Sequence, residues 1–417
     1  MSKYPKLATI LLLPWVAWCC VQMAVAQAIS SSPGLGAAAA AYYVDGASAQ
    51  ASDKNPGTEA LPWKTIQHAA AALQAGDTVY IKAATYRGDV RPARSGRASG
   101  WITYSAYPGE EQRAVIEGGV FRIEQKSYIK VSGLKIQHVA GEGILAIGPG
   151  ANLVISGNCT YDTSESGIAI WGVRWRSDPG EYDFKAVTNV IVENNTIEMA
   201  CDGGYNEQLD IANGVDCFEV RNNILKNGTN AIYGGEGIDI KEGASNGKVW
   251  GNEIFNIRRY GIYVEAGASD PAYYRIRPAL LTNIEVFNNV VHDNDDHGIG
   301  ITSEGRGNID GIKVYNNLVY GNGADGILLY HYPGAVNSIS NISIFHNTVY
   351  SNATRLTYSG GIAADHDIAQ NVVIRSNIVY GNPGFQIKTD LNPRAIVDHN
   401  LTNPITGAEP GTAGKRL

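Results

Sequence analysis

The segment "IEVFNNVV" (284–291) decides the fold, because close copies of it recur from about residue 150 onward. Each copy contains an apolar strand, an asparagine-rich turn and a second apolar strand. The other copies are "VIVENNTI" (190–197), "FEVRNNIL" (218–225), "KVWGNEIF" (248–255), "IKVYNNLV" (312–319), "ISIFHNTV" (342–349) and "VVIRSNIV" (372–379). The second asparagine of the turn, or its equivalent, falls at positions 195, 223, 252, 289, 317, 347 and 377.

A second phrase alternates with the first and consists of a glycine followed by an alternating strand. Examples are "GIDIK" at 237, "GIYVE" at 261 and "GIGIT" at 298. A period near 30 residues with two or three short strands is typical of a solenoid, and the alternation of apolar residues excludes helical repeats. Each strand is therefore expected to stack on its counterpart one turn away, with apolar side chains inside and asparagines hydrogen-bonded in a ladder.

The ends of the chain differ from the repeat. The segment "WKTIQHAAAALQAG" (63–76) predicts a helix that caps the N-terminal end of the coil, where unpaired strand edges would invite aggregation. Residues 1–28 have a basic start, an apolar run and small residues in an A-x-A pattern, which predicts a cleaved export signal. An uncleaved membrane anchor is the alternative. We expect the coil over 29–400 and a loose tail over 401–417.

Composition narrows the class of protein. The net charge of −7 argues against a nucleic-acid partner, and 48 glycines with 23 tyrosines suit a β-rich chain. The mature chain keeps Cys159, Cys201 and Cys217, which allow at most one disulfide and match no zinc spacing, so buried thiols are expected. The chain is expected to be a monomer that is secreted, periplasmic or on the cell surface, without stable membrane insertion after signal cleavage.

Stacking brings charged residues together. The segment "EGIDIKEG" (236–243) is predicted to lie on the strand 29 residues before it, so that Glu207 stacks under Glu236 and Asp210 under Asp239. Like charges about 5 Å apart repel by about 3 kcal/mol at an effective dielectric near 20, so a proton or a cation has to compensate. Calcium, which prefers several carboxylate and carbonyl oxygens, is the expected ion.

The same face carries a possible base. Because alternate residues of a strand share a face, Asp239 and Lys241 are expected to point outward. The position of Lys241 is expected to become Glu265, Thr302, Tyr330, Asp365 and Lys388 on later rungs. The position of Asp239 is expected to become Tyr263, Gly300, Leu328 and Ala363. The alternative interpretation of the whole cluster is a solvated acidic face that Lys241 and Arg259 neutralise.

The opening "YYVDGASAQASDKNPGTEALPWKTIQHAAAALQAGDTVYIKAATYRGDV" (42–90) resembles the start of polysaccharide lyases of families 9 and 6. The resemblance implies an all-β fold, a single-stranded right-handed parallel β-helix of the pectate lyase superfamily. Such proteins include lyases, hydrolases and epimerases, so the fold does not name the chemistry. The segment "RRYGIYVEAG" (258–267) lacks the adjacent aspartates that family 9 carries before its "GFD" strand.

The resemblance also implies roles for individual residues. In these lyases, acidic residues of neighbouring rungs hold calcium, a lysine on the same face acts as base, and family 6 adds an arginine. Carried over, Glu236 and Asp239 are calcium ligands, Lys241 is the base, and Arg259 or Arg258 is the neutralising cation. From the stacking itself, Glu207 and Asp210 are expected as further ligands and Glu265 as a further catalytic residue. The expected substrate-binding residues on the same face are Arg258, Tyr263, His297, Tyr330, His331 and His366.

A second charged patch has its own interpretation. Asp295, Asp296, His297, Glu304 and Arg306 resemble the acidic and histidine motifs of polygalacturonases, and the alternative is a polar turn. A pair of carboxylates one rung apart would suit a retaining glycosidase.

These observations predict an enzyme that acts on an acidic polysaccharide, with calcium as cofactor. The expected reaction is β-elimination: a base removes the C5 proton of a uronate whose carboxylate charge is neutralised by calcium or arginine, and we expect the pKa of Lys241 to be lowered by nearby cations. The alternatives are a glycoside hydrolase, a C5-epimerase and a non-catalytic glycan-binding surface protein.

Overall fold

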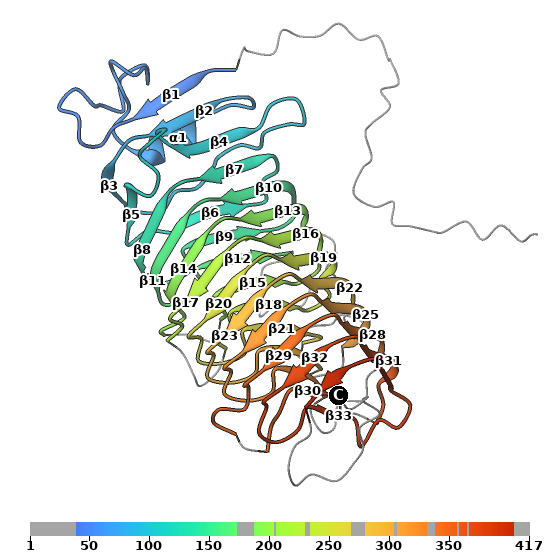
Figure 1. Cartoon of the computed structure of the whole chain (residues 1–417). Coiled ribbons are helices and arrows are strands. Elements are labelled where there is room, and N and C mark those ends of the chain that lie inside the picture. Colours follow the sequence, from blue (N-terminus) through green and yellow to red (C-terminus); the bar gives the residue numbers. More distant parts are fainter. Residues whose placement is uncertain are drawn as a thin grey trace, which may run out of the picture. The chain divides into compact units, whose positions relative to one another are not determined.

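The computed structural model describes residues 39–172, 187–203, 206–229, 234–267, 280–303, 307–331, 338–356, 358–364 and 367–403. These residues belong to one compact unit, 38–417, which coils into three parallel sheets (Figure 1). The predicted all-β parallel helix is therefore confirmed. Within the described ranges, no helix has both the length and the hydrophobicity to span a membrane.

The first sheet has 13 strands in the described residues and begins at the N-terminal end of the coil. Its strands, in spatial order, are β1 (Ala41–Val44), β2 (Thr78–Ile81), β4 (Ile102–Ala106), β7 (Ile129–Ser132), β10 (Gly150–Ser156), β13 (Val187–Glu193), β16 (Val215–Arg221), β19 (Ser245–Trp250), β22 (Leu280–Phe287), β25 (Asn308–Tyr315), β28 (Ile339–Phe345), β31 (Gln370–Arg375) and β34 (Ile396–Asp398).

The second sheet follows the first across the asparagine turns. Its strands are β3 (Ala84–Arg87), β5 (Ala114–Glu117), β8 (Lys135–Val139), β11 (Cys159–Thr163), β14 (Thr196–Ala200), β17 (Ile224–Lys226), β20 (Glu253–Phe255), β23 (Val290–His292), β26 (Leu318–Tyr320), β29 (Thr348–Tyr350), β32 (Ile378–Tyr380) and β35 (Leu401–Thr402). The last strand carries the coil two residues past the expected boundary at 400.

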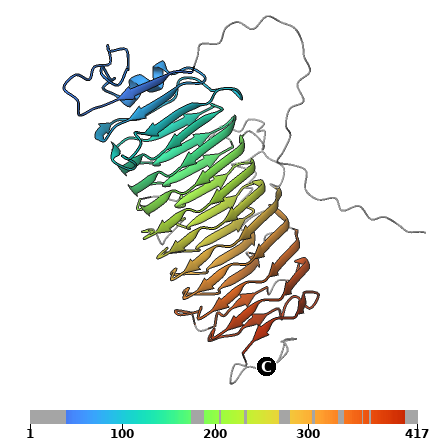
Figure 2. The same ribbon diagram turned by 45° about the horizontal axis from the view of Figure 1, so that its top comes forward.

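The third sheet contains the glycine-led strands and positions the candidate site. Its strands are β6 (Phe121–Glu124), β9 (Ile144–Ile147), β12 (Ile168–Trp171), β15 (Leu209–Ala212), β18 (Ile238–Lys241), β21 (Ile262–Glu265), β24 (Ile299–Ser303), β27 (Ile327–His331), β30 (Ile362–Ala363) and β33 (Ile387–Lys388). Turned by 45°, the view shows the strands of successive rungs side by side along the coil (Figure 2).

The helix α1 (Ile66–Ala72) is shorter than the segment 63–76 that predicted it. It begins at the cap residue Thr65, whose hydroxyl accepts a hydrogen bond from the His68 N–H, as capping requires. Its buried face contains Ile66, Ala69 and Ala70 and joins the core. It lies beside β1, the first strand of the first sheet (Figure 1).

A ladder of buried asparagines runs along the coil between the first and second sheets. Each side-chain amide donates to the Oδ1 of the next asparagine at 2.9–3.1 Å, and the same oxygen accepts the backbone N–H of the previous one. The members are Asn158, Asn195, Asn223, Asn252, Asn289, Asn317, Asn347, Asn377 and Asn400. The expected ladder is confirmed and extends one asparagine further at each end.

The inferred register of the third sheet is confirmed around the acidic rungs. Asp210 pairs with Asp239, and Lys241 pairs with Glu265. The expectation for Lys388 is wrong, because it pairs with Ala363 and so continues the column of Asp239. The strand β30 has only two residues, so the alignment by sequence spacing slipped between these last rungs.

Several predictions concern residues outside the described ones. They include the export signal, Glu304, Arg306, Asp365, His366 and most of the tail. The cysteines Cys159, Cys201 and Cys217 form no disulfide, and of these only Cys201 is fully buried, so burial of all three was wrong.

Asn289→Ala tests the ladder. The change removes the acceptor of two buried donors, the Asn252 backbone N–H and side-chain amide, and should lower the free energy of unfolding by about 2–4 kcal/mol. Asn308→Ala is the matched control, since it also removes the acceptor of two donors, both on the more exposed Ser338, and should cost below about 1 kcal/mol. Denaturant unfolding measures both, and equal losses would contradict a special role for the ladder.

Candidate functional site

The strands β15 and β18 position four carboxylates on neighbouring rungs. Asp210 and Asp239 are paired residues of the two strands. Glu207 and Glu236 lie in the turns that lead into them, where the Gln208 N–H donates to the Glu236 carbonyl oxygen. The short distance between rungs therefore collects the four acids on one face of the third sheet.

All four carboxylates are buried. Their residues are 4% (Glu207), 2% (Asp210), 3% (Glu236) and 2% (Asp239) exposed. A solvated acidic face would leave such groups in water, so this alternative is wrong. Burying a carboxylate is costly unless another group compensates its charge, and this cluster requires such compensation.

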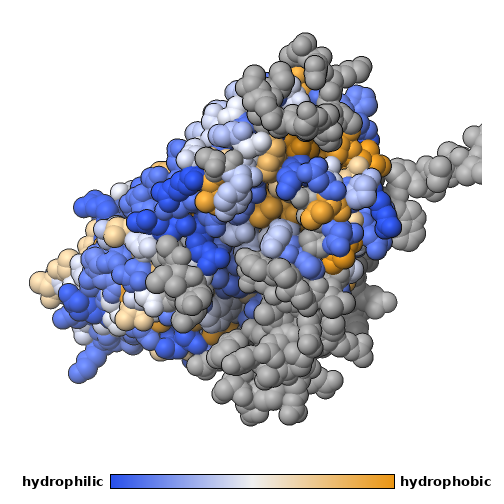
Figure 3. Space-filling model, turned by 90° about the horizontal axis from the view of Figure 1, so that it is seen from below, coloured by the Kyte–Doolittle hydropathy of each residue, from blue (hydrophilic) through white to orange (hydrophobic). Residues whose placement is uncertain are grey.

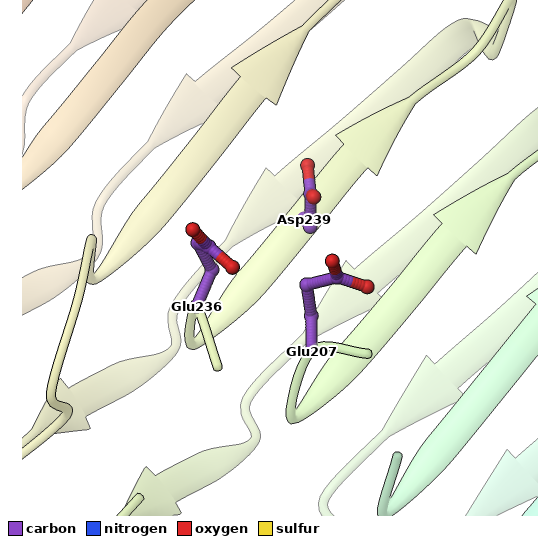
Figure 4. Close-up of side chains that lie close together, drawn as sticks. All are labelled: Glu207, Glu236 and Asp239. Carbon is purple, nitrogen blue, oxygen red and sulfur yellow. The ribbon is translucent and has the colours of Figure 1, made fainter. Parts of the chain in front are cut away.

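The three residues Glu207, Glu236 and Asp239 converge on one point. Each offers a carboxylate oxygen, and these oxygens lie within 4.8 Å of one another. Figure 4 shows the three side chains reaching toward a common space from adjacent rungs. Among the described residues, one oxygen each of Glu207, Asp239 and Asp210 is buried without a hydrogen-bond partner.

Among the described residues, two cations reach the cluster. The Lys241 Nζ lies 2.7 Å from Glu207 Oε1, 3.4 Å from Asp239 Oδ2 and 4.0 Å from Asp210 Oδ1. On the other side, the Arg259 Nε lies 2.9 Å from Glu236 Oε1. With the buried Glu265 beside Lys241 on the next rung, the carboxylates outnumber the cations among the described residues of the cluster.

The excess negative charge shows in the pKa values of the acids. Burial raises the pKa of Asp210 to about 8, although Lys241 opposes the shift. Burial and the neighbouring Glu207 raise the pKa of Glu236 to about 7, although Arg259 opposes it. Burial likewise raises the pKa of Asp239 well above its usual range. In the absence of another cation, the cluster therefore retains protons.

The expected lowering of the lysine pKa is wrong. Burial acts to lower the pKa of Lys241, but the carboxylates of Asp210, Glu207 and Asp239 outweigh burial and raise it well above its ordinary value. The sequence argument placed the lysine near cations, whereas Arg259 pairs with Glu236. Lys241 is therefore an ammonium group that fills part of the space between the acids.

Trp171 joins the site without having been predicted there as an individual residue. Trp171 lies on β12, one rung before β15. Its indole Nε1 donates a hydrogen bond to Asp210 Oδ2, and the two atoms are 2.6 Å apart. The bond leaves Asp210 one oxygen that accepts no hydrogen bond among the described residues. Sequence spacing could have identified Trp171, because alternate residues of a strand share a face. Trp171 lies two residues after Ala169, which pairs with Asp210.

Other predicted site residues lie on the same sheet further toward the C-terminus. Tyr263 is buried above Asp239 and packs against Tyr260, with ring centroids 4.3 Å apart. His297 also stacks with Tyr260, and the centroids of the two rings are 4.9 Å apart. Tyr330 and His331 follow on β27. These residues extend the line of the carboxylates.

Arg258 does not join the carboxylates. Its Nη1 lies 3.3 Å from Asp295 Oδ2, and its side chain is largely exposed. Neighbouring residues in a turn point to different sides, which explains why only Arg259 of the arginine pair reaches Glu236.

Residues 42–202 match a family model described as Pel9A-like, right handed beta helix region. Over these residues the chain is similar to that family's right-handed β-helix region. The match confirms the resemblance seen in the opening segment and the hand of the coil. It ends before Glu207, so it covers the N-terminal rungs of the coil and not the carboxylate rungs.

Whole-chain comparisons agree on the fold. The uncharacterized protein YwoF of Bacillus subtilis (strain 168) is 29% identical over 385 residues, 84% of this chain and 78% of that protein. The pectate lyase Pel9A matches with a TM-score of 0.51 and 14% identity over 88% of this chain and 79% of its own. The A-module of the Azotobacter vinelandii mannuronan C-5 epimerase AlgE4 matches with a TM-score of 0.58 and 15% identity over 90% and 97%.

The buried acids predict an unusual dependence of stability on pH. Glu236 and Asp210 have raised pKa values in the folded state, so the folded protein binds more protons than the unfolded chain between the two pKa values. Their stabilisation is complete below about pH 4 and is lost as the pH rises through about 7 to 8. In chelator, the melting temperature should therefore fall from about pH 5 to about pH 8.5.

Glu236→Gln is the control for this titration, because the amide has a similar shape and does not titrate. It should remove part of the decline in melting temperature. A melting temperature that is flat or rises over this range in the unaltered protein would contradict the assignment of the buried acids.

Proposed function

We propose that this protein is a calcium-assisted lyase that cleaves an acidic, uronate-containing polysaccharide by β-elimination. The observation that carries the proposal is the convergence of Glu207, Glu236 and Asp239 within 4.8 Å, next to Lys241 on the same face. Two proteins of the same fold, a pectate lyase and a mannuronan C-5 epimerase, support it by what their names state.

The residues present fit a hard cation such as calcium. Calcium takes several oxygen ligands, and the cluster offers only oxygens. Glu207 and Asp239 each direct a buried oxygen without a hydrogen-bond partner among the described residues into this region, as does Asp210. Glu207, Glu236 and Asp239 would hold the ion, and Asp210 would support it. The excess of carboxylates over cations among the described residues explains why a divalent cation would be favoured there.

When bound, calcium would supply positive charge that neutralises the uronate carboxylate of the substrate and the acids around Lys241. Neutralising that carboxylate makes the C5 proton acidic enough to be removed. The remaining chemistry falls to side chains of the chain itself.

Lys241 is the proposed base, because its amine is the only lysine nitrogen at the cluster among the described residues and remains partly accessible. With the surrounding acids neutralised by a bound cation, the pKa of Lys241 would fall and its amine would be neutral. That neutral amine would take the C5 proton, and the electron pair would form the C4–C5 double bond. The C4–O bond would break, and water would donate a proton to the leaving glycosidic oxygen. Arg259, paired with Glu236, would hold that acid in place and add a second positive charge near the substrate. Glu265 would orient Lys241 from the next rung.

The remaining expectations are proposals of the same kind. Tyr263, His297, Tyr330, His331 and His366 would contact the sugar chain on the C-terminal side of the cluster. Export through residues 1–28 would bring the enzyme, as a monomer, to a polysaccharide outside the cytoplasm.

Calcium binding is testable without any substrate. Calcium at roughly 100 times its Kd should stabilise the protein by about 2.7 kcal/mol, measured as a rise in melting temperature. Glu207→Gln and Asp239→Asn should each remove most of this rise. Asp310→Asn, on β25 of the first sheet, is the control and should keep it. A calcium effect that survives both cluster variants would place the ion elsewhere.

Lyase activity is tested on pectate, alginate, glucuronan and glycosaminoglycan, by the ultraviolet absorbance of an unsaturated product. Chelation should abolish the activity, and Lys241→Ala should lower kcat by about 10²- to 10⁴-fold, as expected for loss of a general base. Lys313→Ala, a half-exposed lysine paired with Glu285 on the first sheet, should leave it unchanged.

The rival functions give different products. New reducing ends without absorbance would indicate a hydrolase. Exchange of the C5 proton with solvent without chain cleavage would indicate an epimerase, which begins with the same proton removal. Full activity in Lys241→Ala would show that another group is the base.

A further inference from the structure

A cavity of about 550 Å³ lies on the C-terminal side of the carboxylate cluster. We call it the C-terminal pocket; its walls include Tyr260, His297, Asp325, Tyr358, Phe385 and Lys388. A volume of this size is typical of pockets that bind small molecules. The strands β30 and β33, next to which several of these residues lie, are at the lower end of the coil in Figure 1.

The pocket and the carboxylate cluster share one line of turns. The N–H groups of Gly237, Gly261 and Gly298 donate to the carbonyl oxygens of Tyr260, His297 and Asp325, respectively. Each of these acceptors therefore occupies, on a successive rung, the position that Glu236 holds on its own rung. Rungs are about 4.8 Å apart, so the pocket begins about one rung beyond the acids.

The rim of the pocket is unusually apolar for an exposed surface. Tyr358 is 76% exposed and Leu391 is 61% exposed, the two highest values among the exposed large hydrophobic side chains of the described residues. Both line the pocket. The space-filling view from below shows hydrophobic side chains gathered in one area among hydrophilic ones (Figure 3). Exposed apolar groups around a cavity indicate a ligand that covers them.

Aromatic rings form one wall. Tyr260 stacks with His297 and lies against the tilted ring of Tyr263. Tyr330 and Phe385 pack against the small cluster that contains Tyr260, Tyr263, Leu328 and Ala363. Flat rings with polar tips suit a ligand that has apolar faces and a polar rim, as the pyranose ring of a sugar has.

The polar groups of the pocket are fixed by hydrogen bonds. The His297 Nδ1 accepts the Asp325 N–H at 3.0 Å, which leaves any ring proton of the neutral form on Nε2, 3.4 Å from Asp296 Oδ1. Asp325 Oδ1 accepts the Gly360 N–H at 2.6 Å. Burial lowers the pKa of His297, so the ring is neutral near pH 7.

The charges that face the pocket do not favour an acid. Among the described residues they are the carboxylates of Asp296 and Asp325 and the ammonium of Lys388, a net charge of −1. Lys388 lines the pocket, where it continues the column of Ala363 and Asp239. Carboxylates accept hydrogen bonds from sugar hydroxyls, whereas they repel a uronate.

We propose that the C-terminal pocket binds a neutral pyranose unit of the same polysaccharide whose uronate lies at the carboxylate cluster. The inference rests on the proposed function, which supplies both the path of the polysaccharide and the uronate at the carboxylate cluster. It implies that the substrate runs along the coil, across successive rungs, and contains both acidic and neutral sugars. Tyr358 and Leu391 cover the apolar face of the neutral unit, and Asp325 accepts from its hydroxyls.

The test measures binding of galacto-, manno- and xylo-trisaccharides and of trigalacturonate by titration calorimetry. The protein carries Asp239→Asn, so that the carboxylate cluster contributes little and pocket binding stays measurable even if the lyase proposal fails. At least one neutral trisaccharide should bind more tightly than trigalacturonate. Tyr358→Ala should weaken that binding at least about 10-fold, a value that corresponds to about 1.4 kcal/mol.

Tyr380→Ala is the matched control, a tyrosine that is 42% exposed and does not line the pocket, and it should change the Kd less than about twofold. Leu391→Ala provides a second variant on the other side of the rim and should also weaken binding. The proposal is overturned if no neutral trisaccharide binds in a way that depends on Tyr358 or Leu391, or if trigalacturonate binds there at least as tightly.

Discussion

The buried asparagine ladder is the interaction on which the rest of the structure depends. A ladder residue accepts a backbone N–H of the neighbouring rung and donates to a strand carbonyl, which pairs these buried polar groups where the chain bends between sheets. Because an unsatisfied buried donor is costly, the ladder allows essentially one register between adjacent rungs. The same register places each of the remaining strand residues of a rung above its counterpart on the neighbouring rung. This holds for the third sheet as well as for the first two.

At the candidate site, this register brings like charges together and so lowers the stability of the fold. Stacking Asp210 under Asp239 and Glu207 near Glu236 concentrates negative charge that the fold itself has no reason to bury. Lys241 and Arg259 compensate only part of it, and raised carboxylate pKa values are the consequence. A rigid scaffold can hold such a cluster because the strand pairing on both sides stabilises it, and clusters of perturbed acids are typical of functional sites.

Much of the fold and part of the site could be predicted from the sequence. The asparagine spacing determined the rungs, and the rungs determined that Glu207, Asp210, Glu236, Asp239 and Lys241 meet. Three features could not be predicted: the burial of the acids, the direction of the Lys241 pKa shift and the separation of Arg258 from Arg259. Each of these features depends on the positions of side-chain ends in three dimensions. Sequence spacing cannot distinguish two neighbouring arginines of one turn. The position of Lys388 was missed because rung length changes near the C-terminus.

The sequence by itself determined the repeat, the parallel pairing and the identity of the residues that share a column, since a period of about 30 residues with asparagine at one turn admits little else. Only the tertiary structure decided which columns are buried, which acids lack hydrogen-bond partners among the described residues, and where a cavity opens beside them. The reason is physical: pairing is a property of the backbone and repeats with it, whereas burial and charge compensation depend on the particular side chains that surround each group.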